Sequence, residues 1–427
     1  MSLSGRAPAI VGRVVTSVHD LDALAPAWSA LHHASGAGVF QSWEWQRTWW
    51  RHFGEVDRRR RLFVVVLEAR GQVCAIAPFF VEQVPVFPGL GLRRLSFIGS
   101  GVTDYLDVLV SRGEEQAVCE EIAACLARHS SQYEVIWLRD LADGSPVRIP
   151  LLAALRRNGF EGDAFPSEHC PRLPLQPTWR ETLAAFAGKY RRKVIGRMRK
   201  LSENFTVELE MSDNESDIVS DVDDFMAMHQ HRFVQAGKKG VFAEAVVRAF
   251  QREIAASFFR RGWLRLAFLK VDGKRVASIC GFAHRGEFAH YLSGMRETSE
   301  VARFSPGITL IFLCMEALHL QGIRLYDFLR GTEPYKHEIG ATSVPNWSIV
   351  VTHRGARLAR AKNVVSLLGE SLVRRADQER IAFNHHRARH GVLSRDMVRY
   401  LWNRLGVILR DGLKKARAPA KSLTAAE

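Results

Sequence analysis

Residues 304–336 constrain the fold of this chain more than any other stretch. A Ser-Pro-Gly turn opens the stretch, and Pro306 suits the first turn of a helix, where its missing N–H is not needed. Apolar residues then cover most faces of the segment, which predicts a buried helix that ends at Gly322 and is followed by a short strand. Gly307 leaves room for an anion to approach the free backbone N–H groups at the start of this helix.

Charged and aromatic residues close the stretch, directly after the predicted strand. Strand ends in open α/β sheets face ligand crevices, so this cluster predicts chemistry at the edge of a sheet. Taken singly, each charged residue there is more typical of a surface ion pair. The cluster consists of Asp327, Arg330, Glu333, Tyr335 and Lys336.

The length of 427 residues favours two or three domains, each large enough to bury a core. A hydrophobic fraction of 47% excludes a largely disordered chain. The N-terminus lacks the apolar run of a signal peptide and no stretch is long enough for a membrane span, so we expect a cytoplasmic protein. The six cysteines form no CxxC pair, which predicts buried free thiols. His229 and His231 would point to different sides of a helix, so we expect no metal site.

The net charge of +15 is concentrated near the C-terminus. Residues 354–427 contain 17 Lys or Arg against 6 Asp or Glu, a surplus of 11 that leaves the rest of the chain nearly balanced. A solvated helix face explains such a tail. Attraction to anionic lipid, nucleic acid or an acidic polymer is the alternative.

Two predicted hairpins indicate an internal repeat. LEARGQVCAIAPFF at residues 67–80 aligns with LKVDGKRVASICGF at residues 269–282 without a gap, and helices, a strand and a further helix surround both in the same order. The sequence therefore predicts an α/β (α+β) chain with two similar domains at 10–168 and 172–353, each a mixed β-sheet flanked by helices. A basic helical tail at 354–427 follows.

A predicted basic helix begins the second domain. It carries seven cations and no anion within residues 189–200. Lys189, Arg192 and Lys193 could hold phosphate groups. A solvated face over an apolar stripe explains the same pattern equally well.

Five segments together carry a family resemblance. They are FQSWEWQRTWWRHFG (40–54), LRRLSFIGSGVTDYLDVLV (92–110), the basic helix, the hairpin at 269–282, and SPGITLIF…LYDFLRGTEPYK (305–336). The chain resembles, over about residues 10–350, the acetyltransferases of the GNAT superfamily associated with cellulose and exopolysaccharide biosynthesis. These are called CelD-like proteins and are related to the FemAB peptidyltransferases.

The resemblance implies tandem GNAT-like domains and acetyl-CoA, or another acyl-CoA, as co-substrate. In such folds the pyrophosphate lies against backbone N–H groups at the start of the central helix, which corresponds here to residues 303–309. The expected donor contacts come from Arg303, Ser305, Gly307, Ile308 and Thr309.

Acyl transfer from a thioester requires a base for the acceptor, stabilisation of the oxyanion and a proton for the departing thiolate. We expect Glu333 to act as the general base and Tyr335 as the acid or as a hydroxyl that orients the acceptor, with Asp327 beside them. The residues expected to bind substrate are Arg330, Lys336, Tyr291, Lys189, Arg192 and Lys193.

The leading hypothesis is transfer of an acyl group to an amine or hydroxyl of a sugar or polysaccharide precursor. Two alternatives stay open. One is an aminoacyl-tRNA donor, as the FemAB relatives use, and the other is a non-catalytic accessory protein of polysaccharide biosynthesis. The basic tail is expected to contact a membrane surface or a biosynthetic complex, and nucleic acid is expected only as tRNA in the first alternative.

Overall fold

The N-terminal half of the molecule is a sheet with helices on both faces. The computed structural model describes residues 10–87, 89–235, 237, 239–296, 299–331 and 333–367. The strands of this half are β1 (Ile10–Val15), β2 (Arg60–Ala69), β3 (Gln72–Phe87), β4 (Leu90–Phe97), β5 (Leu109–Val110) and β6 (Val135–Ala142). Its helices are α1 (Val18–Ala23), α2 (Ala25–Ser35), α3 (Trp43–Trp49), α4 (Glu115–Arg128) and α5 (Arg148–Arg157).

Side chains along β2 point alternately to the two faces of the sheet, and helices cover both faces. Val65 and Leu67 belong to a core that includes α4 and α5, whereas Val64 and Val66 belong to a core that includes α2 and α3. Successive side chains of a strand point to opposite faces, so a continuous apolar run is buried on both sides.

The C-terminal half repeats this arrangement. Its strands are β8 (Val207–Met211), β9 (Leu264–Val271), β10 (Lys274–His284), β11 (Glu287–Met295) and β12 (Leu325–Asp327). Its helices are α6 (Trp179–Ala185), α7 (Gly188–Asn204), α8 (Ile218–Gln235), α9 (Ala245–Arg260), α10 (Ser299–Ala302), α11 (Pro306–Leu320) and α12 (Pro334–Glu338). Helices α7 and α11 share a core on one face of the sheet, and α8 and α9 share a core on the other.

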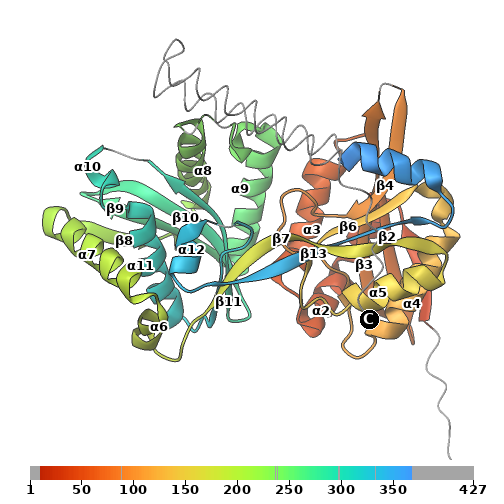
Figure 1. The fold of residues 1–427 in the computed structure, drawn as a ribbon, viewed down its shortest axis with the longest axis horizontal. Helices are drawn as coiled ribbons and strands as arrows, with labels where there is room; N and C mark the ends of the chain where they lie inside the picture. The colour runs from red at the N-terminus through yellow and green to blue at the C-terminus, as the bar shows by residue number, and fades with distance from the viewer. Residues whose placement is uncertain are drawn as a thin grey trace, which may run out of the picture.

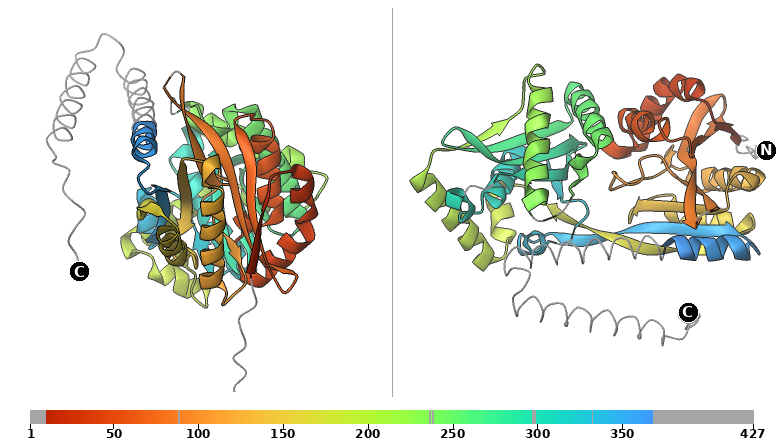
Figure 2. Two further views of the ribbon diagram at one scale, coloured as in Figure 1. Left: turned by 90° about the vertical axis from the view of Figure 1, so that its right-hand side faces the viewer. Right: turned by 90° about the horizontal axis from the view of Figure 1, so that it is seen from above.

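Two long strands join the halves, as Figures 1 and 2 show. They are β7 (Phe160–Pro174) and β13 (Thr342–His353), and the sheet order is β1-β2-β3-β4-β6-β13-β7-β12-β11-β10-β9-β8. β13 follows the C-terminal half in sequence but pairs with β6 of the N-terminal half as well as with β7. The boundary suggested at residues 168–172 therefore lies inside a strand, and the division into two domains stays a prediction.

The predicted fold class is confirmed as a mixed α/β structure with helices around a large mixed sheet. Both hairpins are present as β2–β3 and β9–β10, and the turn residues Arg70, Gly71, Asp272 and Gly273 all have positive φ. This is the backbone that two-residue hairpin turns require. Residues 357–367 are helical, and the remainder of the predicted basic tail lies outside the described residues.

Candidate functional site

Helix α11 begins and ends where the sequence predicted. Ser305 precedes it in the left-handed region, with φ 57° and ψ 61°, and Pro306 occupies its first turn. Gly322 just beyond its end has φ 89°. Arg197 of the basic helix α7 donates a hydrogen bond of 2.8 Å to Ser305 Oγ, so a cation from α7 lies at the start of α11.

A cavity of about 310 Å³, here called the α11 cavity, opens at this helix start. It lies between α8, the far end of β11 and the first turns of α11. Its lining residues are Arg232, Ser278, Ile279, Ser293, Gly294, Met295, Ala302, Ser305, Pro306, Gly307, Ile308, Ile311 and Tyr335. Neither Phe304 nor Leu310 lines it, so these apolar side chains leave the space open.

The α11 cavity combines unsatisfied polar groups with an apolar wall. The Ser278 hydroxyl is buried and has no hydrogen-bond partner among the described residues. Arg232 forms no ion pair with any described residue, although Tyr335 and Glu333 lie close enough to influence its pKa. A buried hydroxyl and a cation without a carboxylate both favour a polar, anionic ligand.

Three of the five predicted donor contacts line this cavity, namely Ser305, Gly307 and Ile308. Thr309 is buried and lines a small neighbouring pocket beside Arg197. Arg303 is exposed and its guanidinium lies 4.7 Å from the ring centroid of Phe304. The structure therefore groups the residues of the helix start and leaves Arg303 outside.

The residues predicted to be catalytic do not lie together in one cavity. Tyr335 lines the α11 cavity, and burial raises the pKa of its phenol. The Glu333 side chain is 56% exposed and lies 2.9 Å from Lys336 Nζ. Burial alone would raise the pKa of Glu333, but the hydrogen bond and charge of Lys336 outweigh it and lower the pKa. Glu333 does not line the α11 cavity.

Lys336 is buried beneath the loop that follows β12. Its side chain is 4% exposed, and Nζ lies within hydrogen-bond distance of the carbonyl oxygens of Phe328, Arg330 and Gly331. These bonds hold the loop in place. The ammonium group therefore faces backbone oxygens and has little access to a substrate.

Asp327, Arg330 and Tyr291 connect the two halves. Asp327 accepts hydrogen bonds from Arg172 Nε at 2.7 Å and from the Tyr105 hydroxyl at 2.8 Å. Arg330 Nε donates to Asp104 at 2.7 Å and Nη1 approaches Asp140 at 3.5 Å. The Tyr291 hydroxyl donates to the Val102 carbonyl at 2.7 Å, so it is turned towards the N-terminal half.

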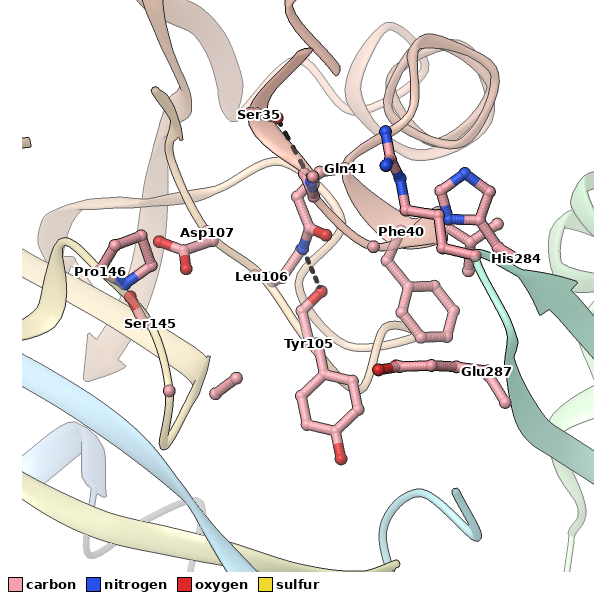
Figure 3. Close-up of a pocket in the computed structure, with 18 of the residues that line it drawn as sticks. Ser35, Phe40, Gln41, Tyr105, Leu106, Asp107, Ser145, Pro146, His284 and Glu287 are labelled. Atoms are coloured by element: carbon pink, nitrogen blue, oxygen red, sulfur yellow. Dashed lines mark hydrogen bonds between the residues drawn. The ribbon is translucent and has the colours of Figure 1, made fainter. Parts of the chain in front are cut away.

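A second cavity, of about 390 Å³, lies where the halves meet and is called the interhalf cavity. In Figure 3, Phe40, Tyr105 and Asp107 from the N-terminal half surround it together with His284 and Glu287 from the C-terminal half. Its charged and polar lining residues are Ser35, Gln41, Tyr105, Asp107, Arg112, Glu115, Ser145, Arg172, His284, Arg285, Glu287 and Asp327.

Burial perturbs several titratable groups of the interhalf cavity. Desolvation raises the pKa of Asp107 to about 7 and also raises the pKa of Glu287. Desolvation and the neighbouring His32 lower the pKa of His284 to about 4, so its ring is neutral. Perturbed groups that line a cavity are typical of functional sites.

Sequence reasoning assigned only Asp327 of this cavity to the site. The other acidic groups lie on segments far apart in sequence that meet only in the folded chain. A signal was nevertheless present, because Tyr105 and Asp107 belong to GVTDYLDVLV, a segment that carried part of the family resemblance.

The three predicted phosphate-binding cations, Lys189, Arg192 and Lys193, are exposed on α7. They form no ion pair with the described residues and line neither cavity. Figure 1 shows α7 beside α11, so these cations lie on the helix next to α11.

Over the described part of the chain, no group of three His, Cys, Asp or Glu residues could hold a metal ion. None of the described helices is long and apolar enough to cross a membrane. His229 is buried, and desolvation lowers its pKa to about 3.

Comparison with known proteins gives this geometry a context. Residues 188–337, from α7 to α12, match the family model of the acetyltransferase (GNAT) domain. This region is similar to GNAT acetyltransferases. The match covers every residue that lines the α11 cavity, so the GNAT-like region and the helix-start cavity coincide. No curated protein matches the chain significantly.

Three solved structures are similar to this chain at low sequence identity. FemX superposes with a TM-score of 0.54 at 12% identity, over 79% of this chain and 96% of FemX. L-PGS from Bacillus licheniformis gives a TM-score of 0.47 at 13% identity, over 86% of this chain and 99% of that chain. A tandem GNAT protein from the clavulanic acid biosynthesis pathway gives 0.42 at 12% identity, over 81% and 99%. The likeness to FemX shows a common fold.

Proposed function

We propose that the protein transfers an acyl group, acetyl in the usual case, from acyl-CoA to an amine or hydroxyl of a sugar or polysaccharide precursor. One observation carries the proposal: a cavity at the start of α11, inside the GNAT-like region, contains an arginine that forms no ion pair with the described residues and a buried hydroxyl with no hydrogen-bond partner among them. At the helix start the donor left for a ligand is the Gly307 N–H, because Pro306 has no N–H and the N–H groups of Ile308 and Thr309 donate to the Ser305 carbonyl at 3.0 and 3.2 Å.

The residues present fit an acyl-CoA. Arg232 inside the cavity and Arg197 at its edge supply cations for phosphate oxygens. Met295, Ile308 and Ile311 supply an apolar wall for the thioester arm. Gly307 lets a ligand approach the backbone closely because it carries no side chain.

We place the acceptor in the interhalf cavity. Glu287 and Ala289, at the first end of β11, line this cavity, whereas Ser293 and Met295, at the other end, line the α11 cavity. A strand rises about 3.3 Å per residue, so the two ends lie roughly 13–26 Å apart. The acceptor on this proposal is an extended saccharide that spans this distance and brings its reacting amine or hydroxyl to the thioester. The mixture of carboxylates, arginines and aromatic rings also suits a hydroxylated ligand.

Tyr335 is our candidate for a hydroxyl that orients the acceptor or hydrogen-bonds to the departing thiolate, because it lines the α11 cavity and its raised pKa keeps the phenol protonated. The same raised pKa makes the phenol a weak proton donor, so we do not assign to it the transfer of a proton to sulfur. Glu333 remains the proposed base only if the loop after β12 moves on substrate binding, because its carboxylate is paired with Lys336 at 2.9 Å. A Glu333→Gln variant with full turnover would remove it from the mechanism.

A thioester-release assay tests the proposal. The full-length protein is mixed with a panel of acyl-CoAs and with amino sugars and short saccharides, and free CoA thiol is followed. We expect release above the acceptor-free rate for at least one pair, and a KM for acyl-CoA raised about tenfold or more in Arg232→Ser. Arg180→Ser, an exposed arginine of α6, is the matched control and should leave KM unchanged.

One observation favours a second candidate. The exposed cations of α7, the helix beside α11, would suit a larger polyanion, such as the tRNA of an aminoacyl-tRNA donor. Calorimetric titration separates the two donors. Retained tRNA affinity without binding of acetyl-CoA would favour the second, and absence of both would favour an accessory protein.

The CelD-like resemblance is our reason to name a polysaccharide precursor as acceptor and the cytoplasm as the compartment. We further propose that the basic segment 354–427 brings the protein to an anionic membrane surface or to a biosynthetic complex. Co-sedimentation with phosphatidylglycerol vesicles that is lost at high salt would support this proposal.

A further inference from the structure

Strand β11 contains a bulge beside the α11 cavity. Its pairing with β10 passes from Cys280 opposite Leu292 to Phe282 opposite Ala289, so two residues of β11 face the single residue Gly281. In a regular strand, residues three apart point to opposite faces. The extra residue of the bulge removes this alternation and brings the side chains of His290 and Ser293 to the same side.

These side chains form a hydrogen-bonded chain that ends at the cavity. His290 Nδ1 lies 2.8 Å from the Tyr326 hydroxyl, and His290 Nε2 lies 2.6 Å from Ser293 Oγ. Tyr326 and His290 are buried, whereas Ser293 lines the α11 cavity. Neither hydroxyl has another hydrogen-bond partner among the described residues.

Counting hydrogen-bond donors and acceptors shows which group donates in each of these two hydrogen bonds. If His290 carried its proton on Nδ1, the buried Tyr326 O–H would lack an acceptor, at a cost of about 1–3 kcal/mol. If the proton is on Nε2, Tyr326 donates to Nδ1 and Nε2–H donates to Ser293 Oγ. Burial lowers the pKa of His290 to about 3, so the ring is neutral and carries a single proton. The hydrogen-bond accounting assigns that proton to Nε2.

In this arrangement of donors, the hydroxyl proton of Ser293 has no acceptor among the described residues. Ser293 Oγ accepts from His290, so its own O–H is free to point into the α11 cavity. Hydrogen bonds that run in one direction polarise each other, which strengthens the last donor. A serine held in this way differs from a surface serine, because its orientation is fixed before a ligand arrives.

We propose that the Ser293 hydroxyl donates a hydrogen bond to the carbonyl oxygen of the bound thioester, with His290 and Tyr326 as the residues that position it. This inference rests on the proposed acyl-CoA function. The acceptor lone pair forms a bond to the carbonyl carbon while the C=O electrons move to oxygen. Collapse then breaks the C–S bond and releases the thiolate. The proton that the acceptor amine or hydroxyl loses passes through solvent to the thiolate sulfur, so the step balances. Ser293 stabilises the negative oxygen and keeps its own proton.

Removal of one such donor typically reduces kcat by about 100-fold to 1000-fold. We therefore expect a loss of about 100-fold for Ser293→Ala, with affinity for acetyl-CoA changed less than about threefold. Tyr326→Phe removes only the distal hydroxyl and should cost about 10-fold in kcat. Tyr133→Phe is the matched control, because Tyr133 also buries a hydroxyl whose single bond, to Leu126, lies in the N-terminal half. It should leave kcat unchanged.

The direct test is isotope-edited infrared spectroscopy of carbonyl-labelled acetyl-CoA bound to the full-length protein, together with calorimetry. We expect the carbonyl band of the wild-type complex at lower frequency than that of free acetyl-CoA. In Ser293→Ala the band should return towards the free value, and in Tyr326→Phe it should shift part of the way.

Each outcome has a distinct meaning. An unchanged band in Ser293→Ala with acetyl-CoA still bound overturns the role of Ser293 and leaves the proposed function standing. Absence of acetyl-CoA binding to the wild type overturns the proposed function, and the inference with it. If Ser293→Ala does not fold, the carbonyl band of acetyl-CoA bound to Tyr326→Phe is used instead. A shift of this band towards the free value supports the proposed role of Ser293, and an unchanged band contradicts it.

Discussion

Lys336 places a charge where water is nearly absent, and three backbone carbonyls with the Glu333 carboxylate compensate for its burial. A buried charge is tolerated only when it is paired and hydrogen-bonded. The loop between β12 and α12 is therefore built around this ammonium group, and Glu333 is part of the same arrangement.

Replacement of Lys336 by Met should destabilise the protein by about 2–3 kcal/mol, because the three carbonyls lose their donor. Urea denaturation measures the change in the free energy of unfolding. Lys189→Met on the exposed face of α7 is the control, with an expected change within about 0.5 kcal/mol. Equal stability of both variants would show that Lys336 has no structural role.

Asp107 should make stability depend on pH. Its folded-state pKa of about 7 is above the ordinary aspartate pKa of 3.8, so the folded protein binds more protons than the unfolded chain between these values. Stability therefore falls as pH rises from about 4 to 7. Asp107→Asn cannot titrate and should flatten this part of the profile, measured by urea denaturation at pH 5, 6, 7 and 8. Parallel profiles for the two proteins would contradict the raised pKa.

For single residues, the sequence indicated that the segment 327–336 belongs to the site, but it did not show which cavity each side chain would face. Asp327 to Lys336 looked like one cluster, yet Asp327 faces the interhalf cavity, Tyr335 the α11 cavity, and Lys336 the backbone. Which way each side chain points after a strand ends depends on loop geometry, and Leu329 even adopts a positive φ of 52°. Residue spacing alone does not contain that information.

The start of α11 is the element on which the proposed function depends. Gly307 lines the cavity, and a Cβ there would lie 2.9 Å from the flexible Met295 Sδ. Gly307→Ala should change stability little, because the gain in helix propensity of about 0.5–1 kcal/mol offsets this contact. Affinity for acetyl-CoA should fall about tenfold, measured by calorimetry.

Gly196→Ala, in the middle of α7, separates the two effects. A Cβ at Gly196 meets nothing within 4 Å. This variant should gain about 0.5–1 kcal/mol in stability and bind acetyl-CoA like the wild type. Equal donor affinity in the Gly307 and Gly196 variants would place the donor elsewhere.

Prediction from sequence at the element scale succeeded where local signals are strong. Helix α11 has the expected bounds, because the Ser-Pro-Gly turn at its start and Gly322 beyond its end are strong local signals. The crossing strand β7 gave no such signal, because Pro166 and Pro171 interrupt it and proline is unusual inside strands. Pairing with β13, a strand almost 180 residues away, stabilises it instead.

The whole molecule is held together by more than the shared sheet. Trp45 of α3 packs against Phe250 of α9, with ring centroids 5.2 Å apart, so one core crosses from one half to the other. Arg330 adds a buried link to Asp104 and Asp140. The pKa of Asp140 is raised to about 6 by burial, against the effect of Arg330.

We therefore expect the described halves to unfold in a single calorimetric transition. Arg330→Met leaves two buried carboxylates without their cation and should destabilise the protein by about 3–5 kcal/mol. Arg192→Met, an exposed residue of α7, is the control. Two separate transitions in the wild type, or equal stability of the variants, would show that the halves are independent.

The order of the strands could not be derived from sequence at this scale. The repeat of hairpins predicted two similar units, but the passage of β13 back to β6 depends on contacts between distant segments. The two cavities depend on the same long-range arrangement, since one lies between the halves and the other at the end of β11.

Calorimetric titration of acetyl-CoA into the full-length protein tests the central claim most directly. We predict saturable binding of one molecule per chain, weakened about tenfold or more by Arg232→Ser and unchanged by Arg180→Ser. Absence of acetyl-CoA binding to the wild type, or equal affinity of the wild type and Arg232→Ser, would contradict a donor site at the start of α11.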